Sequence, residues 1–254
     1  MSLTDDLGTS LQLNGVHRVV SLVPSLTEAI AVSALGVLVG ATEWCTHPDD
    51  LDVPRFGGTK NPDIEGIVAV APDLVVMNEE ENKPEHVAAL REAGVAVWVT
   101  DIRTVDGALT SLRRLLEALD APHRTWVEEA ERAWAEVSAA PPGDRRRAVV
   151  PIWRRPWMAL GSDTYAGDVL RRLGVDNVLA DSPERYPRVD LETLPAIDLV
   201  VLPDEPYRFT ADDGPEAFDV PAALVDGRAL TWYGPAMVDA PRVLTDALSA
   251  TMER

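Results

Sequence analysis

The sequence has little of what disulfide bonding, nucleic-acid binding and membrane insertion require. Cys45 is the only cysteine among 254 residues, which excludes a disulfide within the chain. Lysine and arginine number 23 against 42 aspartates and glutamates, and the formal net charge of −19 argues against binding to nucleic acid or to an anionic membrane surface. The longest apolar run, residues 29–40, is too short to cross a bilayer. We therefore expect no nucleic-acid partner and no membrane insertion.

The motifs of common catalytic centres are absent as well. No serine stands in a Gly-x-Ser-x-Gly frame, and the sequence has no phosphate-binding glycine loop, no His-Glu-x-x-His and no Cys-x-x-Cys. Cys45 and His47 lie close together, but no third metal ligand stands beside them. The sequence thus predicts no catalytic residue, no metal site and no required cofactor. A binding protein is favoured over an enzyme.

The amino-terminal segment lacks the features of a secretion signal. Residues 1–15 contain two aspartates and no basic stretch ahead of an apolar run. As it stands, the sequence predicts a cytoplasmic protein, whereas removal of a leader would imply an extracytoplasmic one.

Residues 104–139 carry the strongest helical pattern of the chain. Apolar residues recur every three or four positions in two runs, which Pro122 separates. At 1.5 Å per residue the second run spans about 25 Å, which is close to the width of a small domain. Trp126 and Trp134 fall at helical spacing and, like Trp98 in a strand-like run, are expected in the core. We predict two helices that connect two half-molecules.

Short segments of the first half recur, in order, in the second half. The pairs are residues 18–24 with 147–153, 35–37 with 173–175, 62–67 with 189–194, and 73–78 with 198–203. In both halves, β-branched runs without alternation lie between helical segments, which is typical of parallel sheets buried on both faces. The pattern therefore predicts an internal repeat of two α/β lobes.

The predicted organisation follows from these segments. It comprises an N-terminal arm (1–16), an N-terminal α/β lobe (17–103), connecting helices (104–140) and a C-terminal α/β lobe (141–254). Both lobes are expected to be Rossmann-like with parallel sheets, joined by the long connecting helix. Because ligands bind beyond the carboxyl ends of parallel strands, we expect a ligand cleft between the lobes. A chain of this design is expected to be a monomer.

Large aromatic residues follow the predicted strand ends, on loops that should face a ligand. They are Trp44, Trp153, Trp157, Tyr186, Tyr207, Trp232 and Tyr233. Rigid amphipathic rings bind ligands at a small cost in conformational entropy, so these residues predict a wide aromatic pocket for a small molecule. The alternative interpretation is that the rings only cover the cores of their loops.

Three arginines stand beside these rings, namely Arg154, Arg155 and Arg208. In so acidic a protein, arginines on strand-end loops indicate recognition of a carboxylate or phosphate on the ligand. The alternative is that they form ion pairs with acidic residues of neighbouring loops. The acidic residues considered are Glu79, Glu80, Glu81, Asp204 and Glu205.

Four motifs resemble those of a known protein class. They are residues 18–28 (RVVSLVPSLTE), 53–62 (VPRFGGTKNP), 71–76 (APDLVV) and 160–165 (LGSDTY). They are similar to motifs of periplasmic substrate-binding proteins with a helical backbone, the helical backbone metal receptor superfamily. The resemblance covers roughly residues 17–250 and is strongest to vitamin B12-binding components of ABC importers. It implies a class III substrate-binding protein fold, small hinge motion, and non-catalytic binding of a corrinoid or metal chelate.

The resemblance also implies roles for single positions. The loops of Trp44, of residues 153–157 and of residues 232–233 would line a corrinoid. Glu85 and Glu192 would each present a carboxylate to arginines of an ABC permease if the protein is exported, and ordinary surface glutamates are the alternative.

Other candidate functions are a ferric-siderophore or haem binder, a cytosolic ligand carrier or sensor, an enzyme using Glu79–Glu81 as acid–base groups, and a pure interaction module.

Overall fold

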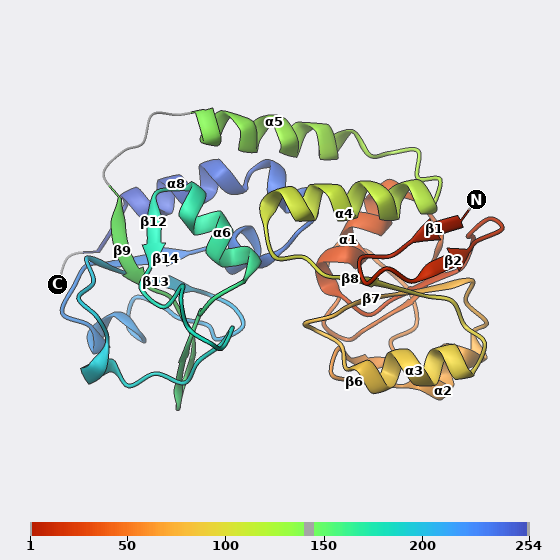
Figure 1. Ribbon diagram of the computed structural model, residues 1–254, viewed down its shortest axis with the longest axis horizontal. Helices are drawn as coiled ribbons and strands as arrows, with labels where there is room; N and C mark the ends of the chain where they lie inside the picture. Colours follow the sequence, from red (N-terminus) through yellow and green to blue (C-terminus); the bar gives the residue numbers. More distant parts are fainter. Residues whose placement is uncertain (1, 140–144, 253–254) are drawn as a thin grey trace. The chain divides into compact units, whose positions relative to one another are not determined.

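The computed structural model describes residues 2–139 and 145–252, and the chain forms two units (Figure 1). Unit 1 comprises Met1–Ile102, Ala108–Glu128 and Tyr233–Pro235, and unit 2 comprises Arg103–Gly107, Glu129–Trp232 and Ala236–Arg254. Each unit contains a parallel four-stranded sheet with helices packed on it, so the predicted fold class is confirmed. The predicted boundary between residues 140 and 141 lies outside the described residues. No helix in the described part of the chain is long and apolar enough to cross a membrane.

The sheet of unit 1 has the strand order β4-β3-β7-β8, and all neighbours are parallel. Its strands are β3 (Val19–Ser21), β4 (Leu38–Ala41), β7 (Leu74–Asn78) and β8 (Val97–Thr100). Helix α1 (Pro24–Ser33) lies on one face, and α2 (Ile64–Ala69) and α3 (Pro84–Glu92) lie on the other (Figure 1). Val20 and Val75 pack with Ile67 of α2 and Leu90 of α3 in one buried cluster. A two-stranded ribbon, β5 (Gly57–Gly58) and β6 (Asn61–Pro62), precedes α2.

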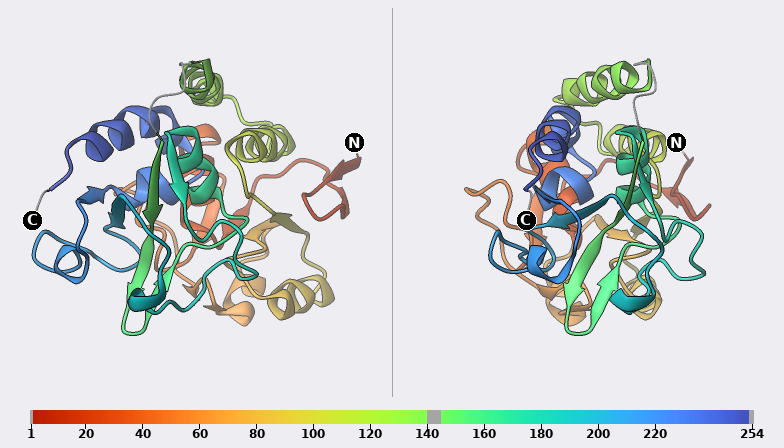
Figure 2. Two further views of the ribbon diagram at one scale, coloured as in Figure 1. Left: turned by 60° about the vertical axis from the view of Figure 1, so that its left-hand side comes forward. Right: turned by 90° about the vertical axis from the view of Figure 1, so that its left-hand side faces the viewer.

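The sheet of unit 2 has the order β12-β9-β13-β14 and is also entirely parallel. Its strands are β9 (Arg146–Val149), β12 (Val175–Asn177), β13 (Leu199–Pro203) and β14 (Ala222–Val225). Its helices are α6 (Tyr165–Arg172), α7 (Gly227–Thr231), α8 (Ala240–Ser249) and the short 3-10 turns η1 (Leu191–Thr193) and η2 (Pro215–Ala217). A third 3-10 turn, η3 (Pro235–Val238), begins at the last residue of unit 1 and continues in unit 2. An antiparallel hairpin, β10 (Pro151–Arg154) and β11 (Trp157–Ala159), continues from the end of β9 (green strands in Figure 2).

The two sheets follow the same path, because in each the first strand lies between the second and the third, with the fourth at the edge. The same side-chain contact recurs as well. The carboxylate of Asp73 accepts a hydrogen bond from the Arg18 N–H at 2.9 Å, and that of Asp198 accepts one from the Arg147 N–H at 2.9 Å. Each aspartate thus ties the start of the third strand to the start of the first. The repeat predicted from the sequence is confirmed by this shared topology.

The predicted connecting helices are α4 (Val105–Ala118) and α5 (Thr125–Ala139), and the chain passes from one unit to the other within each of them. Trp126 and Trp134 are buried, as expected. The indole N–H of Trp126 donates to Ser33 Oγ at 2.8 Å. Helix α5 begins three residues later than Pro122, because Asp120 adopts a left-handed conformation (φ 49°) and the His123 N–H donates to the Ser33 carbonyl instead of entering a helix.

The predicted N-terminal arm, residues 1–16, contains regular secondary structure. Residues 2–12 form a hairpin of β1 (Ser2–Thr4) and β2 (Ser10–Gln12). The Asp6 N–H donates to the Val99 carbonyl at 3.1 Å, and the Asp6 carboxylate accepts from the Ser111 hydroxyl at 2.5 Å. The hairpin therefore covers the edge of β8, which would otherwise expose unpaired backbone groups.

Candidate functional site

Buried hydroxyl and thiol groups fix the carboxyl edge of the unit 1 sheet. The Thr27 hydroxyl lies 2.8 Å from Ser21 Oγ and 3.0 Å from Cys45 Sγ, and Thr42 Oγ1 lies 3.1 Å from the same sulfur. Burial raises the pKa of the Cys45 thiol, against smaller opposing effects of its hydrogen bonds to Thr27 and Thr42. Cys45 is thus a neutral, buried packing residue that anchors the loop after β4. Within residues 2–139 and 145–252, no group of three or more His, Cys, Asp or Glu is arranged to hold a metal ion.

Trp44 is the exposed ring of this loop, with 64% of its surface accessible. Its indole nitrogen lies 3.0 Å from the position that a Cβ on Gly58 would take, so a glycine at 58 lets the ring lie close to the ribbon β5–β6. The Glu43 N–H donates to the Gly57 carbonyl at 2.9 Å and ties the loop to the same ribbon. Trp44 is therefore an open aromatic surface on a fixed loop, as its predicted binding role requires.

The acidic loop after β7 is held by two asparagines. Asn78 Oδ1 accepts from the Glu80 N–H at 2.9 Å, and Asn82 Oδ1 accepts from the Asn78 N–H at 2.8 Å. Glu81 accepts a hydrogen bond from the Tyr233 hydroxyl at 3.1 Å. Tyr233 is only 6% exposed, and burial, followed by the nearby charges of Glu81 and Glu80, raises the pKa of its hydroxyl well above 10. Tyr233 thus packs inside unit 1 and does not present an open ring.

Unit 2 contains a cluster of five aromatic rings, which we call the aromatic cluster. Its members are Trp153, Trp157, Tyr207, Phe209 and Phe218, from β10, β11 and the segment after β13. Trp157 stacks on Phe209 with ring centroids 6.0 Å apart, and Trp153 meets Tyr207 edge to face at 5.7 Å. Phe209 and Phe218 are buried, whereas Trp153 remains 44% exposed. Preformed rings of this kind give an apolar ligand a rigid surface.

Phe209 and Phe218 were not among the site residues predicted from the sequence. A signal was available, because the chain has only three phenylalanines and two of them lie in the short polar segment after β13. The expected loop at residues 153–157 is also wrong. Trp153 and Trp157 lie on the paired strands of a hairpin, which holds both rings in a fixed register.

Arg154 is bound within the protein. Its guanidinium pairs with Asp213 and Glu216 and lies 5.2 Å from the centroid of the Trp157 ring. The Asp213 carboxylate also accepts a hydrogen bond from the Tyr207 hydroxyl at 2.6 Å. Arg154 therefore forms ion pairs within the protein, which was the alternative prediction. Its partners, however, are not among the five acidic residues that were named from the sequence. Arg155 and Arg208 are exposed, and neither has an ion pair or side-chain hydrogen bond among the described residues.

The other predicted rings of unit 2 lie outside the aromatic cluster. Tyr186 is half-buried on a segment that pairs with β11, where the Val189 N–H donates to the Trp157 carbonyl at 3.0 Å. Trp232 is half-buried at the end of α7, with the Arg228 guanidinium 5.3 Å from its ring centroid. The structure therefore brings Trp153, Arg154, Trp157 and Tyr207 together. It places Trp44 and Tyr233 in unit 1.

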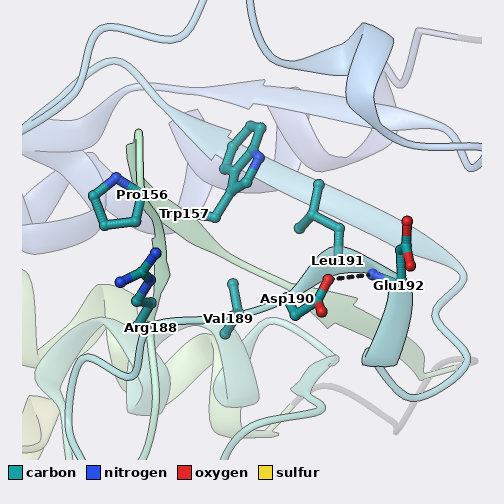
Figure 3. Close-up of a pocket in the computed structure, with 7 residues that line it drawn as sticks. All are labelled: Pro156, Trp157, Arg188, Val189, Asp190, Leu191 and Glu192. Carbon is teal, nitrogen blue, oxygen red and sulfur yellow. Dashed lines mark hydrogen bonds between the residues drawn. The ribbon is translucent and has the colours of Figure 1, made fainter.

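A pocket of about 670 Å³ opens beside Trp157 (Figure 3). It is lined by Pro156, Trp157, Arg188, Val189, Asp190, Leu191 and Glu192. Apolar side chains and one indole form part of the walls, and Arg188, Asp190 and Glu192 supply polar groups. Glu192, predicted for permease docking, thus lines the same pocket as Trp157, predicted for ligand binding.

The repeat gives Glu192 a counterpart in unit 1. Asp190 accepts a hydrogen bond from the Glu192 N–H and begins η1, and Asp63 accepts one from the Gly66 N–H and begins α2 with Glu65 in its first turn. Glu65 therefore occupies the place of Glu192, while Glu85 lies exposed in the first turn of α3. The sequence signal for Glu65 is the match of residues 62–67 with 189–194.

Comparisons with known proteins agree with this architecture. The family model described as periplasmic binding protein matches residues 19–202. The vitamin B12-binding protein of Vibrio parahaemolyticus serotype O3:K6 is 23% identical over 185 residues, which cover 70% of this chain and 66% of that protein. The match thus spans less than two thirds of that relative.

Solved structures share the fold at low sequence identity. The periplasmic vitamin B12 binding protein BtuF of Vibrio cholerae is 20% identical with a TM-score of 0.74, covering 92% of this chain and 97% of that chain. The periplasmic heme binding protein HutB of Vibrio cholerae is 21% identical with a TM-score of 0.73, covering 91% and 98%.

Proposed function

The chain belongs to the periplasmic binding protein family, and from this premise we propose that it binds a bulky, partly planar small molecule of the corrinoid or haem type without transforming it. The observation that carries the proposal is the exposure of two indoles. Four large hydrophobic side chains are exposed among the described residues, namely Leu7, Leu35, Trp44 and Trp153. Two of the four are tryptophans, and both follow the carboxyl ends of sheet strands. Rigid rings exposed beyond strand ends are available to contact a planar ligand.

The first test is a titration of the full chain with cyanocobalamin and, separately, with haemin, followed by tryptophan quenching. We expect Trp153→Ala and Trp44→Ala each to weaken binding of the preferred probe about 10-fold, since loss of one stacked ring costs roughly 1–2 kcal/mol. Leu35→Ala is the matched control, because Leu35 is 69% exposed but precedes the amino end of β4. Absence of binding by either probe at high micromolar concentration, or an equal loss in the Leu35 variant, would contradict the proposal.

An anionic ligand, such as haem with its carboxylates or a ferric siderophore, is the second candidate. It is favoured by Arg155 and Arg208, which are exposed and make no ion pair in the part of the chain that the structure describes. Arg188, on the wall of the pocket beside Trp157, adds a third exposed cation. Tighter binding of haemin than of cyanocobalamin in the titration above would favour this candidate, and the reverse order would favour a corrinoid.

We further propose that the protein delivers its ligand to an ABC permease. One exposed glutamate of each unit would contact the permease, Glu192 in unit 2 and either Glu85 or Glu65 in unit 1. The repeat favours Glu65, because it shares the position of Glu192 after an aspartate that begins a helical turn.

Charge reversal tests this partnership. Glu192→Arg is expected to lower ligand-stimulated ATP hydrolysis by the cognate permease in proteoliposomes at least 10-fold, because a like charge at a docking contact costs several kcal/mol. Comparison of Glu65→Arg with Glu85→Arg identifies the contact of unit 1, and each serves as the control for the other. Unchanged stimulation in all three variants would refute the docking role, and ligand titration of each variant checks that binding is intact.

A further inference from the structure

The segment before η1 adds a third strand to the hairpin β10–β11. The Val189 N–H donates to the Trp157 carbonyl at 3.0 Å. Two residues earlier, the Pro187 carbonyl accepts from the Ala159 N–H at 3.1 Å. Both contacts join the segment to β11 in an antiparallel arrangement. Residues 187–189 are therefore the outer strand of a small antiparallel ladder in unit 2.

Arg188 occupies the open side of this outer strand. Because Pro187 and Val189 direct their backbone groups toward β11, the backbone groups of the residue between them point away from it. Arg188 is exposed, and its N–H, its carbonyl and its guanidinium have no hydrogen-bond or ion-pair partner among the described residues. A strand edge with an unpaired donor and acceptor can pair with a further strand.

The pocket of about 670 Å³ beside Trp157 lies next to this edge. Figure 3 shows Arg188 at one end of the pocket and Asp190 and Glu192 at the other, with Trp157 and Leu191 between them. The pocket is open to solvent along its length, so it suits a chain laid across the surface better than an enclosed molecule.

The walls of the pocket are held in place by contacts within unit 2. Trp157 stacks on Phe209 with ring centroids 6.0 Å apart. At the other end, Asp190 Oδ1 accepts the Glu192 N–H at 3.1 Å, which fixes the start of η1. A preformed surface loses little conformational entropy when a partner binds to it.

The charges of the pocket define what it can recognise. Glu192 is exposed, and its side chain has no hydrogen-bond or ion-pair partner in the described part of the chain. The end formed by Asp190 and Glu192 therefore attracts a basic side chain, and Arg188 attracts an acidic one. The indole of Trp157 and the side chain of Leu191 offer apolar surface between these ends.

We propose that this pocket docks an extended segment of a partner protein by strand addition. The segment pairs its backbone with the N–H and carbonyl of Arg188, covers Trp157 with apolar side chains, and places a basic side chain at Glu192. Because the ladder is antiparallel, the basic residue comes first in the segment and an acidic residue, near Arg188, comes last. This inference rests on the proposed docking role of Glu192 and names the chemistry of the segment that unit 2 would receive.

The first test uses peptides as probes, with the full chain and without a permease. The probe is acetyl-Arg-Leu-Val-Glu-amide, which has no aromatic residue, so the tryptophan fluorescence of the protein reports its binding. The control peptide has the same side chains but carries N-methyl groups on its leucine and valine amides. We expect the control to bind about 10-fold more weakly, because strand addition depends on backbone hydrogen bonds. No binding of the probe at millimolar concentration, or equal binding of the two peptides, would overturn the inference.

Two substitutions at Arg188 separate its backbone from its side chain. Arg188→Gln removes the charge and keeps the N–H, whereas Arg188→Pro removes both, and edge strands tolerate proline where the N–H points outward. We expect the probe to bind about 3-fold more weakly to Arg188→Gln and about 10-fold more weakly to Arg188→Pro. Arg147→Gln, which changes an exposed arginine of β9, is the matched control and should bind like the natural chain. Equal affinities of the two Arg188 variants would contradict strand addition, and the N-methyl peptide decides the same point if the proline variant does not fold.

A double-mutant cycle tests the contact at Glu192. Glu192→Gln should weaken binding of the probe about 3-fold, but should leave the affinity for acetyl-Gln-Leu-Val-Glu-amide unchanged, because this peptide has no basic residue to lose. Glu184→Gln, which changes an exposed glutamate of the same unit, is the control. A loss of the same size for both peptides would show that Glu192 does not meet the basic residue.

The peptide experiments and the permease experiment fail independently. If the probe binds through Arg188 and Glu192 while Glu192→Arg still stimulates the permease fully, the proposed permease docking fails and the peptide site stands. If Glu192→Arg abolishes stimulation while the probe does not bind, docking stands and strand addition is refuted.

Discussion

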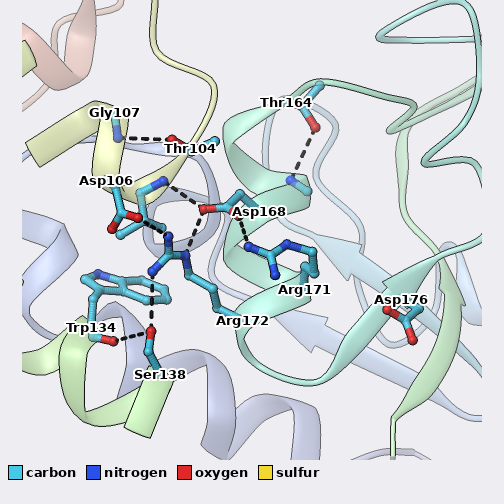
Figure 4. A network of polar contacts seen from close by, with 12 residues as sticks. Thr104, Asp106, Gly107, Trp134, Ser138, Thr164, Asp168, Arg171, Arg172 and Asp176 are labelled. Atoms are coloured by element: carbon cyan, nitrogen blue, oxygen red, sulfur yellow. Dashed lines mark hydrogen bonds and ion pairs between the residues drawn. The ribbon is translucent and has the colours of Figure 1, made fainter.

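Asp168→Ala is expected to lower the free energy of unfolding by about 3–5 kcal/mol, the loss usual for removing one partner from a buried ion pair. Asp168 accepts from the Val105 N–H at 2.9 Å and from Arg172 Nε at 2.8 Å, and it also pairs with Arg171 (Figure 4). Its side chain is only 8% exposed. Alanine would leave the first amide of α4 without an acceptor and a largely buried guanidinium without one of its carboxylates. Urea unfolding followed by circular dichroism measures the change.

Asp176→Ala is the matched control for this substitution. Asp176 pairs with Arg145 at 2.5 Å, but both side chains are more than 40% exposed, so solvent screens the pair and its loss should cost at most about 1 kcal/mol. Equal losses in the two variants would show that the buried network around Asp168 stabilises the fold no more than a surface ion pair does.

The effect of Asp168 is also expected to depend on pH. Burial alone would raise the pKa of Asp168, but hydrogen bonds from Val105, Arg171 and Arg172 outweigh it and hold the pKa below its ordinary value. A carboxylate with a lowered pKa contributes stability above its unfolded pKa of about 3.9 and loses it as the pH falls through the folded value. The difference between the natural chain and Asp168→Ala should therefore shrink below about pH 4.

Trp134→Ala is expected to cost about 3–5 kcal/mol, because it creates a large cavity in the core. Trp134 is 1% exposed, and its indole N–H donates to the Met237 carbonyl at 3.0 Å. Alanine therefore also leaves a buried carbonyl unpaired, which places the loss toward the upper end of that range. Urea unfolding of the full chain gives the value.

Trp44→Ala provides the comparison for Trp134→Ala. The change in residue type is the same, but Trp44 is 64% exposed, so we expect a loss below about 1 kcal/mol. A similar loss in both variants would mean that Trp134, which lies on α5 and bonds to Met237 of η3, contributes no more to stability than a surface ring.

The sheets could be predicted because their signals are local. The strands β7 and β13 are short apolar runs buried along their whole length, and each is preceded by an aspartate, Asp73 or Asp198. Burial on both faces removes the alternation that an exposed strand would show, and the aspartate marks where the strand begins. These features recur at a nearly constant offset along the sequence, so the repeat could be predicted before the strand order of the sheets was known.

The contacts of the candidate site depend on distant residues, which a local pattern does not reveal. Arg154 pairs with Asp213 and Glu216, about 60 positions further along the chain, and nothing near Arg154 selects these two from the many carboxylates available. The hairpin β10–β11 was missed for a related reason, since its third neighbour is the segment around Val189. Likewise, the Asp6 carboxylate near the amino end accepts a hydrogen bond from Ser111, which lies 105 positions further along the chain.

The placement of Tyr233–Pro235 in unit 1 has a consequence for biosynthesis. The chain leaves unit 1 after Glu128, builds unit 2 up to Trp232, and only then supplies the tyrosine whose hydroxyl meets Glu81. A ribosome therefore releases the last piece of unit 1 only after it has made unit 2 up to Trp232. No single cut in the gene yields two complete halves, and a nascent chain stalled before residue 233 would carry an unfinished first unit for chaperones to hold.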